Sequence, residues 1–307
     1  LAFEQNGALV VIRFMDAFTI KDLENLSGIK AHTIRIWEQR YHFLNPSRTD
    51  TNIRYYTNDE LITLLNIALL NKYGFKISHI DKMKPIEMKE RILSLTQSEA
   101  QLERIVNELI ECMVDLRIED FESVLDFQIT SKGIEKTITQ IIFPFLERIG
   151  ILWVTSRVNP AQEHLVTNII RQKLIVGIEK TVPALQVTST ALLFLPEGEH
   201  HELGILFMYY LLKSRGVKVL YLGANVPMRD VVYVADLKGP TFLYTHLTSV
   251  ASNFNFEKFL GKVGATMSNY SVVVSGLLTQ SYKKTIPGNV NLKRSLPEVM
   301  DYLAKLA

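Results

Sequence analysis

Residues 191–204 read ALLFLPEGEHHELG, and the order of residue types in this stretch favours an α/β fold. The apolar run at its start is typical of a buried strand, and the pattern ELGILFMYYLLKSRG over 202–216 is typical of a helix. The loop between them carries two adjacent histidines, His200 and His201, among glutamates. Because α/β sheets bind ligands where strands end and helices begin, this loop is the first candidate for a binding site.

The same alternation continues toward the C-terminus. Apolar runs recur at 217–223, 242–247 and 270–276, and helix-like stretches separate them. This pattern predicts a doubly wound parallel sheet over residues 187–307, with helices on both faces. A nucleotide site of the usual kinds is excluded, since no G-x-G-x-x-G follows the first run and the chain has no Walker-type lysine loop.

Upstream of the predicted sheet, the hydrophobic spacing changes to three and four. Four helical patterns cover 102–116, 118–131, 133–154 and 160–180, which predicts a four-helix bundle over residues 95–182. The segment 84–101 is polar and charged, and we expect it to be a linker that runs into the first helix.

The N-terminal part predicts a winged helix-turn-helix. Thr19 with Asp22 forms a capping-box-like start, Ser27-Gly28 ends a short helix, and KAHTIRIWEQRY over 30–41 begins a second one. Turn formers and a strand-like run then follow over 45–57, as expected for a wing. Five basic residues between 30 and 56 stand against two acidic ones, although the whole chain carries a net charge of only +2. This local charge points to an anionic partner.

Composition excludes several classes of protein. The chain has 307 residues, 47% of them apolar, and no apolar run approaches the roughly 20 residues that cross a bilayer. The single Cys112 has no partner for an internal disulfide or a zinc site. We therefore expect a cytoplasmic protein with several domains and no membrane partner.

The basic segment resembles the MerR family of winged-helix transcription regulators. The matching stretches are Thr33–Tyr41, close to TIRxWExRY, and Asn52–Tyr56, close to NxRxY. The resemblance implies a DNA-binding domain over 15–90, with Met15 as the natural first residue, and a double-stranded DNA operator as partner. The residues expected to contact DNA are Thr33, Arg35, Arg40, Tyr41, Arg48, Arg54 and Tyr56.

The histidine loop resembles the D-x-H-x-x-G motif of cobalamin-binding Rossmann-like domains. Here Glu199, His201 and Gly204 occupy the motif positions. The resemblance implies that His201 is the lower axial ligand of cobalt, that Glu199 accepts the other imidazole N–H, and that Gly204 leaves room for the nucleotide tail. The family's later motifs, S-x-L and G-G, correspond to Thr245 with Leu247 and to Ser275-Gly276. Ser275 in place of glycine adds a side chain where the tail is expected to thread.

The helical region resembles the cap of light-sensing MerR-type repressors of the CarH and LitR kind. Trp153 is followed ten residues later by Glu163-His164, as in that cap, which implies contacts to the upper face of cobalamin, expected in its adenosyl form. In those proteins a histidine directly after the tryptophan binds cobalt once light has expelled the adenosyl group. Val154 stands in that place here, so a bis-histidine photoproduct is not expected.

The resulting prediction is a cobalamin-dependent transcription regulator, a repressor that light could control, with no enzymatic activity. It is expected to be a homo-oligomer, a dimer or tetramer, because added winged helices increase the avidity for DNA. Three alternatives stay open. One is a corrinoid methyltransferase or mutase subunit, another is a regulator that keeps the fold but works without cobalamin, through dimerisation or a protein antagonist, and the third is a sensor of another small molecule.

Overall fold

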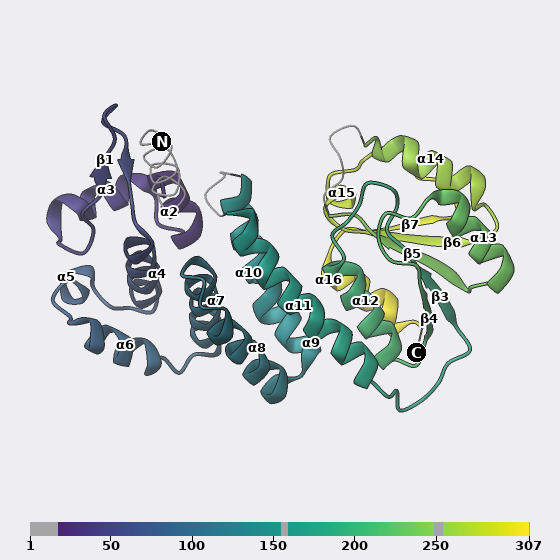
Figure 1. Ribbon diagram of the computed structural model, residues 1–307, viewed down its shortest axis with the longest axis horizontal. Coiled ribbons are helices and arrows are strands. Elements are labelled where there is room, and N and C mark those ends of the chain that lie inside the picture. The colour runs from purple at the N-terminus through teal and green to yellow at the C-terminus, as the bar shows by residue number, and fades with distance from the viewer. Residues whose placement is uncertain (1–17, 155–158, 249–253, 307) are drawn as a thin grey trace, which may run out of the picture. The chain divides into compact units, whose positions relative to one another are not determined.

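A computed structural model describes residues 18–154, 159–248 and 254–306, with the side chains of 151–154 outside that description. The chain forms two compact units, Leu1–Asn168 and Ile169–Ala307 (Figure 1). In the described residues, the first unit is helical apart from a small hairpin, and the second contains a parallel sheet. The predicted fold class, multidomain α and α/β, is confirmed. Within the described ranges, no helix has the length and apolar character needed to cross a membrane.

The N-terminal segment is a winged helix-turn-helix. The capping box of Thr19 and Asp22 starts α2 (Ile20–Ser27), and Gly28 ends it in the left-handed conformation, with φ of 73°. The recognition helix α3 (Ala31–Arg40) follows, and the wing consists of β1 (Ser47–Arg48) and β2 (Arg54–Tyr55), paired antiparallel. These elements agree with the prediction from sequence.

Three further helices complete this segment: α4 (Asn58–Lys72), α5 (Ile77–Ile80) and α6 (Pro85–Leu93). The expected linker over 84–101 therefore holds a helix, and the prediction was wrong there. Pro85 occupies the first turn of α6, where proline is tolerated, while Ile92 and Leu95 are buried. Two apolar anchors suffice to dock a segment whose other residues are mostly polar.

The four predicted helices are present as α7 (Ser98–Val114), α8 (Ile118–Lys132), α10 (Phe143–Val154) and α11 (Pro160–Lys180), and α11 continues from the first unit into the second. Two short elements, α9 (Ile134–Thr137) and the π-helical η1 (Ile138–Ile142), run directly into α10. Pro144 lacks the N–H that an α-helix would bond four residues back, and the widened turn lies immediately before it. The N–H of Phe143 accordingly donates to Ile138, five residues earlier.

The second unit contains a five-stranded parallel sheet in the order β4-β3-β5-β6-β7. The strands are β3 (Thr190–Leu193), β4 (Lys218–Tyr221), β5 (Phe242–His246), β6 (Ser271–Ser275) and β7 (Val290–Lys293). The helices between and after them are α12 (Leu203–Ser214), α13 (Met228–Lys238), α14 (Phe256–Thr266), α15 (Leu277–Gln280) and α16 (Leu296–Ala304).

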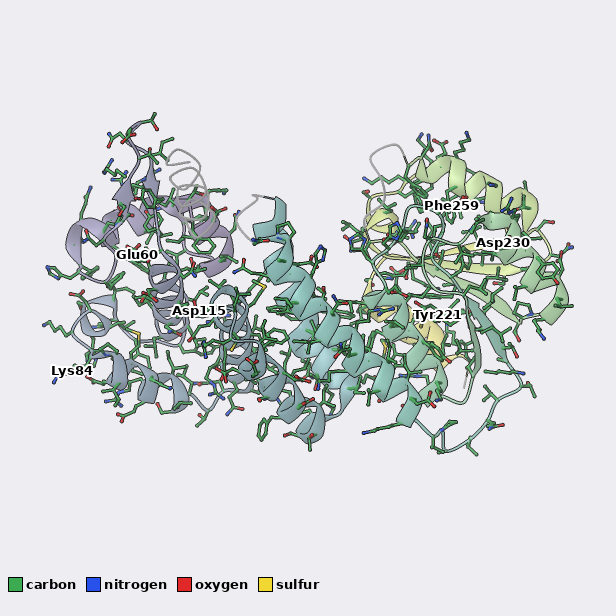
Figure 2. All side chains as sticks on the ribbon, viewed as in Figure 1. Glu60, Lys84, Asp115, Tyr221, Asp230 and Phe259 are labelled. Atoms are coloured by element: carbon green, nitrogen blue, oxygen red, sulfur yellow. The ribbon has the colours of Figure 1, made fainter. Side chains whose placement is uncertain are left out.

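Alternation along the strands builds a core on each face of this sheet. Leu243 and Val272 pack with α13 and α14, including Phe259, which Figure 2 labels. On the other face Phe242 meets Tyr302 of α16, with ring centroids 5.6 Å apart. The two layers of helices leave the carboxyl ends of the strands as the edge where loops gather.

Candidate functional site

The exposed arginines of the winged helix form a candidate DNA-reading surface. Arg35 and Arg40 on α3 are exposed, and so is Arg48 on the wing. Thr33 is half-buried on α3, and Tyr41, half-buried just after it, stacks on Phe43. Three cations on one helix and the adjoining hairpin suit a backbone of phosphates.

Glu38 joins the recognition helix to the wing. Its carboxylate accepts a hydrogen bond from the Tyr56 hydroxyl and pairs with Arg54, whose Nε lies 3.0 Å from Oε2. Tyr56 is fully buried, and this burial together with the bond to Glu38 raises the pKa of its hydroxyl. Tyr56, expected at the DNA surface, therefore lies in the core instead, and Arg54 is half-buried with its Nε on Glu38.

The tip of the wing has its own support. Asn52 adopts a φ of 65°, which asparagine tolerates better than most residues. The Arg48 guanidinium donates to Asn52 Oδ1 over 2.7 Å. Arg48 is thus oriented along the hairpin, and the residue as a whole stays exposed.

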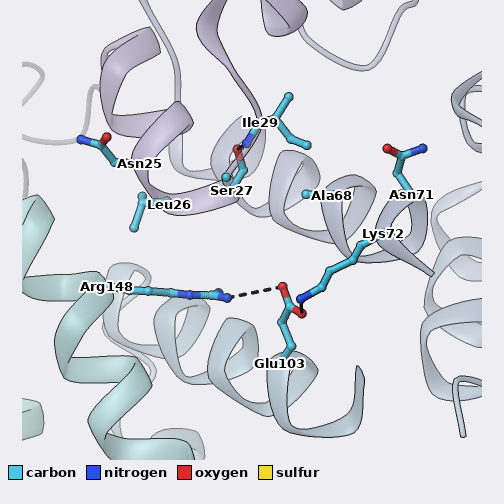
Figure 3. A pocket seen from close by; sticks show the side chains of 10 residues that line it. Asn25, Leu26, Ser27, Ile29, Ala68, Asn71, Lys72, Glu103 and Arg148 are labelled. Carbon is cyan, nitrogen blue, oxygen red and sulfur yellow. Dashed lines mark hydrogen bonds and ion pairs between the residues drawn. The ribbon is translucent and has the colours of Figure 1, made fainter. Parts of the chain in front are cut away.

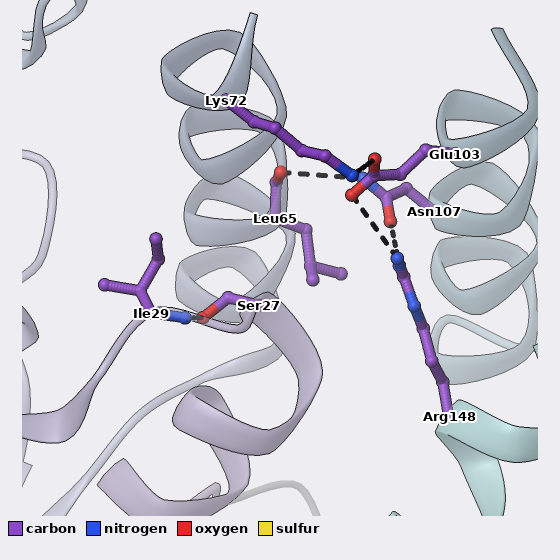
Figure 4. Close-up of polar contacts among 7 residues, drawn as sticks. All are labelled: Ser27, Ile29, Leu65, Lys72, Glu103, Asn107 and Arg148. Atoms are coloured by element: carbon purple, nitrogen blue, oxygen red, sulfur yellow. Dashed lines mark hydrogen bonds and ion pairs between the residues drawn. The ribbon is translucent and has the colours of Figure 1, made fainter. Parts of the chain in front are cut away.

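A cavity of about 410 Å³ lies where the winged helix meets the bundle within the first unit (Figure 3). Lys72 of α4, Glu103 of α7 and Arg148 of α10 line it, together with the end of α2. Lys72 Nζ lies 2.7 Å from Glu103, whose other oxygen lies 3.4 Å from Arg148 (Figure 4). The hydrogen bond to Glu103 raises the pKa of Lys72.

Asn107 extends this cluster. Its Oδ1 accepts a 2.6 Å hydrogen bond from Arg148 Nη1, and its Nδ2 faces the carbonyl of Leu65 at 3.5 Å. Because Leu65 and Lys72 belong to α4, the helix α10 is connected by polar contacts to the DNA-reading segment. We call Lys72, Glu103, Asn107 and Arg148 the polar cluster.

In the second unit, Glu199 and His201 form a pre-organised pair in the loop after β3. The Glu199 side chain is fully buried and lies 2.6 Å from His201 Nδ1. It also accepts hydrogen bonds from the backbone N–H groups of His200, His201 and Thr248 over 2.8–2.9 Å. His200 and His201 are both exposed, and the ring contact with Glu199 is made by His201.

These contacts set the charge of the pair. Burial alone would raise the pKa of the Glu199 carboxyl, but the hydrogen bonds from His201 and Thr248 outweigh it and hold that pKa below its usual range. Because the ionised Glu199 carboxylate can only accept a hydrogen bond, Nδ1 of His201 carries the proton. In the neutral ring the lone pair then lies on Nε2. Nε2 is therefore the ring nitrogen with the lone pair that metal ligation requires.

The loop around the pair is fixed by its neighbours. Gly198, with φ of 84°, donates its N–H to Asn225, whose own N–H donates to the carbonyl of Glu199. Glu202 accepts from the hydroxyl of Tyr221, labelled in Figure 2, and pairs with Arg171 at 2.9 Å. The loop is therefore held on both sides of His201.

The remaining predicted positions lie at the ends of β5 and β6. Thr245 is buried, and its hydroxyl has no hydrogen-bond partner in the described part of the chain. Leu247 is buried and donates its N–H to Ser275. Gly276 has φ of 103°, and a Cβ there would lie 2.3 Å from the Leu247 carbonyl oxygen, so close packing of backbones requires glycine.

Gly204 meets a side chain. A Cβ at this position would lie 2.4 Å from Cδ2 and 2.5 Å from Nε2 of His246. The sequence predicts room for a nucleotide tail there, and the structure places the imidazole of His246 in it. Ser275 Oγ, 2.8 Å from His246 Nδ1, holds that ring.

The predicted upper contacts belong to the first unit. Trp153 and Val154 lie in the last turn of α10, but their side chains are outside the described part of the structure. Glu163 lies in the first turn of α11 and His164 follows it; His164 Nδ1 is 3.2 Å from Glu163, and His164 is exposed. A contact of these residues with cobalamin stays a prediction.

Comparison with known proteins separates the chain into recognised parts. Residues 18–85 match the MerR HTH family regulatory protein, and residues 99–176 match the B12 binding domain. The chain joins a MerR-type helix-turn-helix to a B12-binding domain.

Two relatives from Myxococcus xanthus match the chain over most of their length. The HTH-type transcriptional repressors CarA and CarH are 28% and 27% identical to this chain, and each match covers 87% of it. The matches cover 89% of CarA and 91% of CarH. Among solved structures, the monomethylamine corrinoid protein of Methanosarcina barkeri is 14% identical, with a TM-score of 0.49, over 66% of this chain and 99% of that one.

Three features of the sites were missed from sequence. The roles of Glu38, of the polar cluster and of His246 all depend on residues far apart in the chain. Glu38 offered a signal, because it is the acidic residue within the matched helix stretch. His246 also stood inside a matched motif, but its neighbours there gave no indication that it packs against Gly204.

Proposed function

We propose that the chain is a transcription repressor that binds DNA through its winged helix and whose DNA affinity depends on cobalamin. The proposal rests chiefly on one observation: the buried Glu199 carboxylate orients His201 in the loop between β3 and α12. The two repressors that resemble the chain over most of its length support the regulatory part. The boundaries we propose are 15–90 for the DNA-binding domain, 95–182 for the cap and 187–307 for the sheet domain.

The residues present fit the lower side of a corrin. His201 would supply Nε2 to cobalt, and Glu199 would hold the tautomer and raise the basicity of the ring. The unpartnered hydroxyl of Thr245 would find a polar partner in the tail of the cofactor. When the adenosyl form is bound, the cofactor supplies a cobalt–carbon bond that light breaks, which makes a light response a further part of this proposal.

The DNA-binding role divides between exposed and internal residues. We propose that Arg35, Arg40 and Arg48 contact phosphates or bases, with Thr33 and Tyr41 beside them. Arg54 and Tyr56 would act by holding the wing on α3 through Glu38. This division keeps the matched motif but gives its last two members a positioning role.

A signal also needs a route to the DNA-reading surface. In the first unit, α10 packs against α2 and carries both Arg148 and, in its last turn, Trp153. We propose that movement of α10 when the upper group is bound or lost is transmitted through the polar cluster to α4. Oligomerisation to a dimer or tetramer would add to this by bringing several winged helices onto one DNA.

The experiment is a cofactor titration in the dark. Adenosylcobalamin added to the full chain should bind and show the visible spectrum of a histidine-ligated, base-off corrinoid. His201→Ala should abolish that spectrum, and His200→Ala, one residue away and exposed, is the matched control. DNA affinity measured with and without cofactor, and again after illumination, tests the regulatory part. Equal behaviour of the two variants contradicts the proposed ligand.

One observation favours a second candidate, a repressor of the same fold that works without cobalamin. His246 fills the space beside Gly204 that the resemblance assigns to the tail. In that case the DNA affinity of the full chain should be unchanged by adenosylcobalamin, in the dark and in light. The titration above separates the two.

A further inference from the structure

The topology of the sheet marks one crevice as the binding position. The strand β3 lies between β4 and β5, so the chain leaves β3 toward β4 on one side and returns to β5 on the other (Figure 1). Open α/β sheets bind ligands outside the carboxyl ends of the strands at such a switch point. Glu199 follows β3 and His246 ends β5, so both belong to this crevice.

His246 is built into the crevice rather than lying loosely in it. Its Cα is paired in register with that of Ser275 on β6, and its Nδ1 is 2.8 Å from Ser275 Oγ. Ser275 Oγ is in turn 2.5 Å from the hydroxyl of the buried Tyr244. A hydroxyl that accepts from Tyr244 and donates to Nδ1 matches a neutral imidazole, and burial lowers the pKa of His246 to about 4.

The absence of a side chain at position 204 is what allows this arrangement. The imidazole occupies the place of a missing Cβ in the first turn of α12, so no larger residue fits there while His246 keeps its position. A bulky group can enter beside Gly204 only after His246 leaves Ser275. Entry therefore costs the hydrogen bond and the packing of the ring.

We propose that His246 acts as a plug that makes the site prefer corrinoids without a nucleotide tail over complete cobalamin. The inference rests on the proposed function, because it takes His201 as the cobalt ligand. A corrin ring without the tail needs His201 and Glu199 but not the space beside Gly204. Complete cobalamin needs both and must displace His246 from Ser275.

The test compares two probes, aquacobinamide, which has no nucleotide tail, and hydroxocobalamin, by visible absorbance on the full chain. The parent should bind aquacobinamide more tightly, by about tenfold, which corresponds to the loss of one hydrogen bond and its packing. His246→Ala should raise the affinity for hydroxocobalamin by a similar factor and change that for aquacobinamide by less than about twofold. Ser275→Ala removes the hydrogen bond to His246 but leaves the ring present, so its affinity for hydroxocobalamin should lie between those of the parent and His246→Ala. His200→Ala should bind both probes as the parent does.

A second measurement tests the packing without any corrinoid. Gly204→Ala should lower the melting temperature of the parent because its Cβ meets the His246 ring, and should lower it much less in the His246→Ala background. Additive effects in this double-mutant cycle would overturn the plug.

The binding outcomes separate the two ideas. If the parent binds both probes equally and His246→Ala changes neither, the plug is refuted while the cobalamin site stands. If neither probe binds the parent or His246→Ala, the proposed function fails and the selectivity fails with it. Preference for aquacobinamide that disappears in His246→Ala supports both.

Discussion

Glu38 and Glu199 perform the same structural task in the two units, and the difference between their partners is instructive. Each is a buried or nearly buried carboxylate that ties together segments distant in the chain. Glu38 pairs with the guanidinium of Arg54, whereas Glu199 binds backbone N–H groups and the imidazole of His201. The first arrangement holds the wing against the recognition helix, and the second places the imidazole of His201, the proposed cobalt ligand, at the end of the network.

The largest effect that separates the two carboxylates should come from removing each one. Glu199→Ala leaves three backbone N–H groups without their acceptor, and we expect the second unit to lose about 3 to 5 kcal/mol. Glu38→Ala should cost the first unit about 2 kcal/mol, because Arg54 is partly solvated. Urea unfolding measures the size of each loss, and hydrogen exchange shows which unit has lost stability.

Glu197→Ala is the control for this experiment, since Glu197 lies in the same loop and is exposed. Its effect should stay within about 0.5 kcal/mol. A larger loss for Glu38→Ala than for Glu199→Ala would reverse the contrast.

Acid should destabilise the second unit through His246. Burial lowers the pKa of His246 from 6.5 to about 4, with the charge of Glu199 acting weakly in the opposite direction. Between these values the unfolded chain binds a proton that the folded chain does not. The free energy of unfolding of the second unit should therefore fall as pH falls through this window, by at most about 3 kcal/mol.

His246→Gln should remove this loss. The lowered pKa of Glu199 contributes stability that is fully present above pH 4.5 and is lost as the pH falls below that value, so the contribution of His246 is measured between pH 6.5 and 4.5. Urea titrations at several pH values provide the measurement, and an unchanged slope in His246→Gln would contradict the role given to this ring.

A smaller effect concerns the two arginines of the matched DNA motif. Arg35→Ala should weaken binding to duplex DNA and lower the salt slope by about one, with the stability unchanged, because Arg35 is exposed. Arg54→Ala should weaken binding and also cost about 1 kcal/mol of stability, because Glu38 then lacks its cation. Fluorescence anisotropy across a salt series, paired with urea unfolding, distinguishes the two. If both variants are as stable as the parent, Arg54 contacts DNA directly and does not hold the wing in place.

The smallest predicted effect lies in the polar cluster. Glu103→Gln keeps the size of the side chain but weakens the ion pairs with Lys72 and Arg148, and we expect a loss of about 0.5 to 1 kcal/mol, since these groups are partly exposed. The informative measurement is DNA affinity with and without adenosylcobalamin. The difference between these two affinities should be smaller in Glu103→Gln than in the parent. An unchanged difference would show that the signal bypasses Glu103.

The sequence was sufficient for elements that periodicity or capping specifies. The capping box of Thr19 and Asp22, the wing, the four helices of the bundle and the parallel sheet all follow from spacing. The helix α6 did not, because only Ile92 and Leu95 anchor it and a polar surface helix looks like a linker. A pattern of residue types carries little information where few residues are buried.

The sites were predictable in their identity but not in their geometry. Glu199 and His201 lie together as expected, because two positions in one loop cannot separate far. Tyr56 was misplaced, since a motif match says which residues recur and not which way they face. The packing of His246 on Gly204 joins residues from β5 and α12, and such a contact is fixed only when the sheet has formed.

The widened turn at Ile138–Ile142 also sets the rotational phase of everything after it. One extra residue in a turn rotates the following helix by about 100° about its axis relative to a regular continuation. Arg148 faces Glu103 and Asn107 with this rotation included. Deleting a single residue from the turn would keep α10 helical yet direct Arg148 away from its partners, so the connection between the cap and the DNA-reading helices depends on the count of residues there as much as on their chemistry.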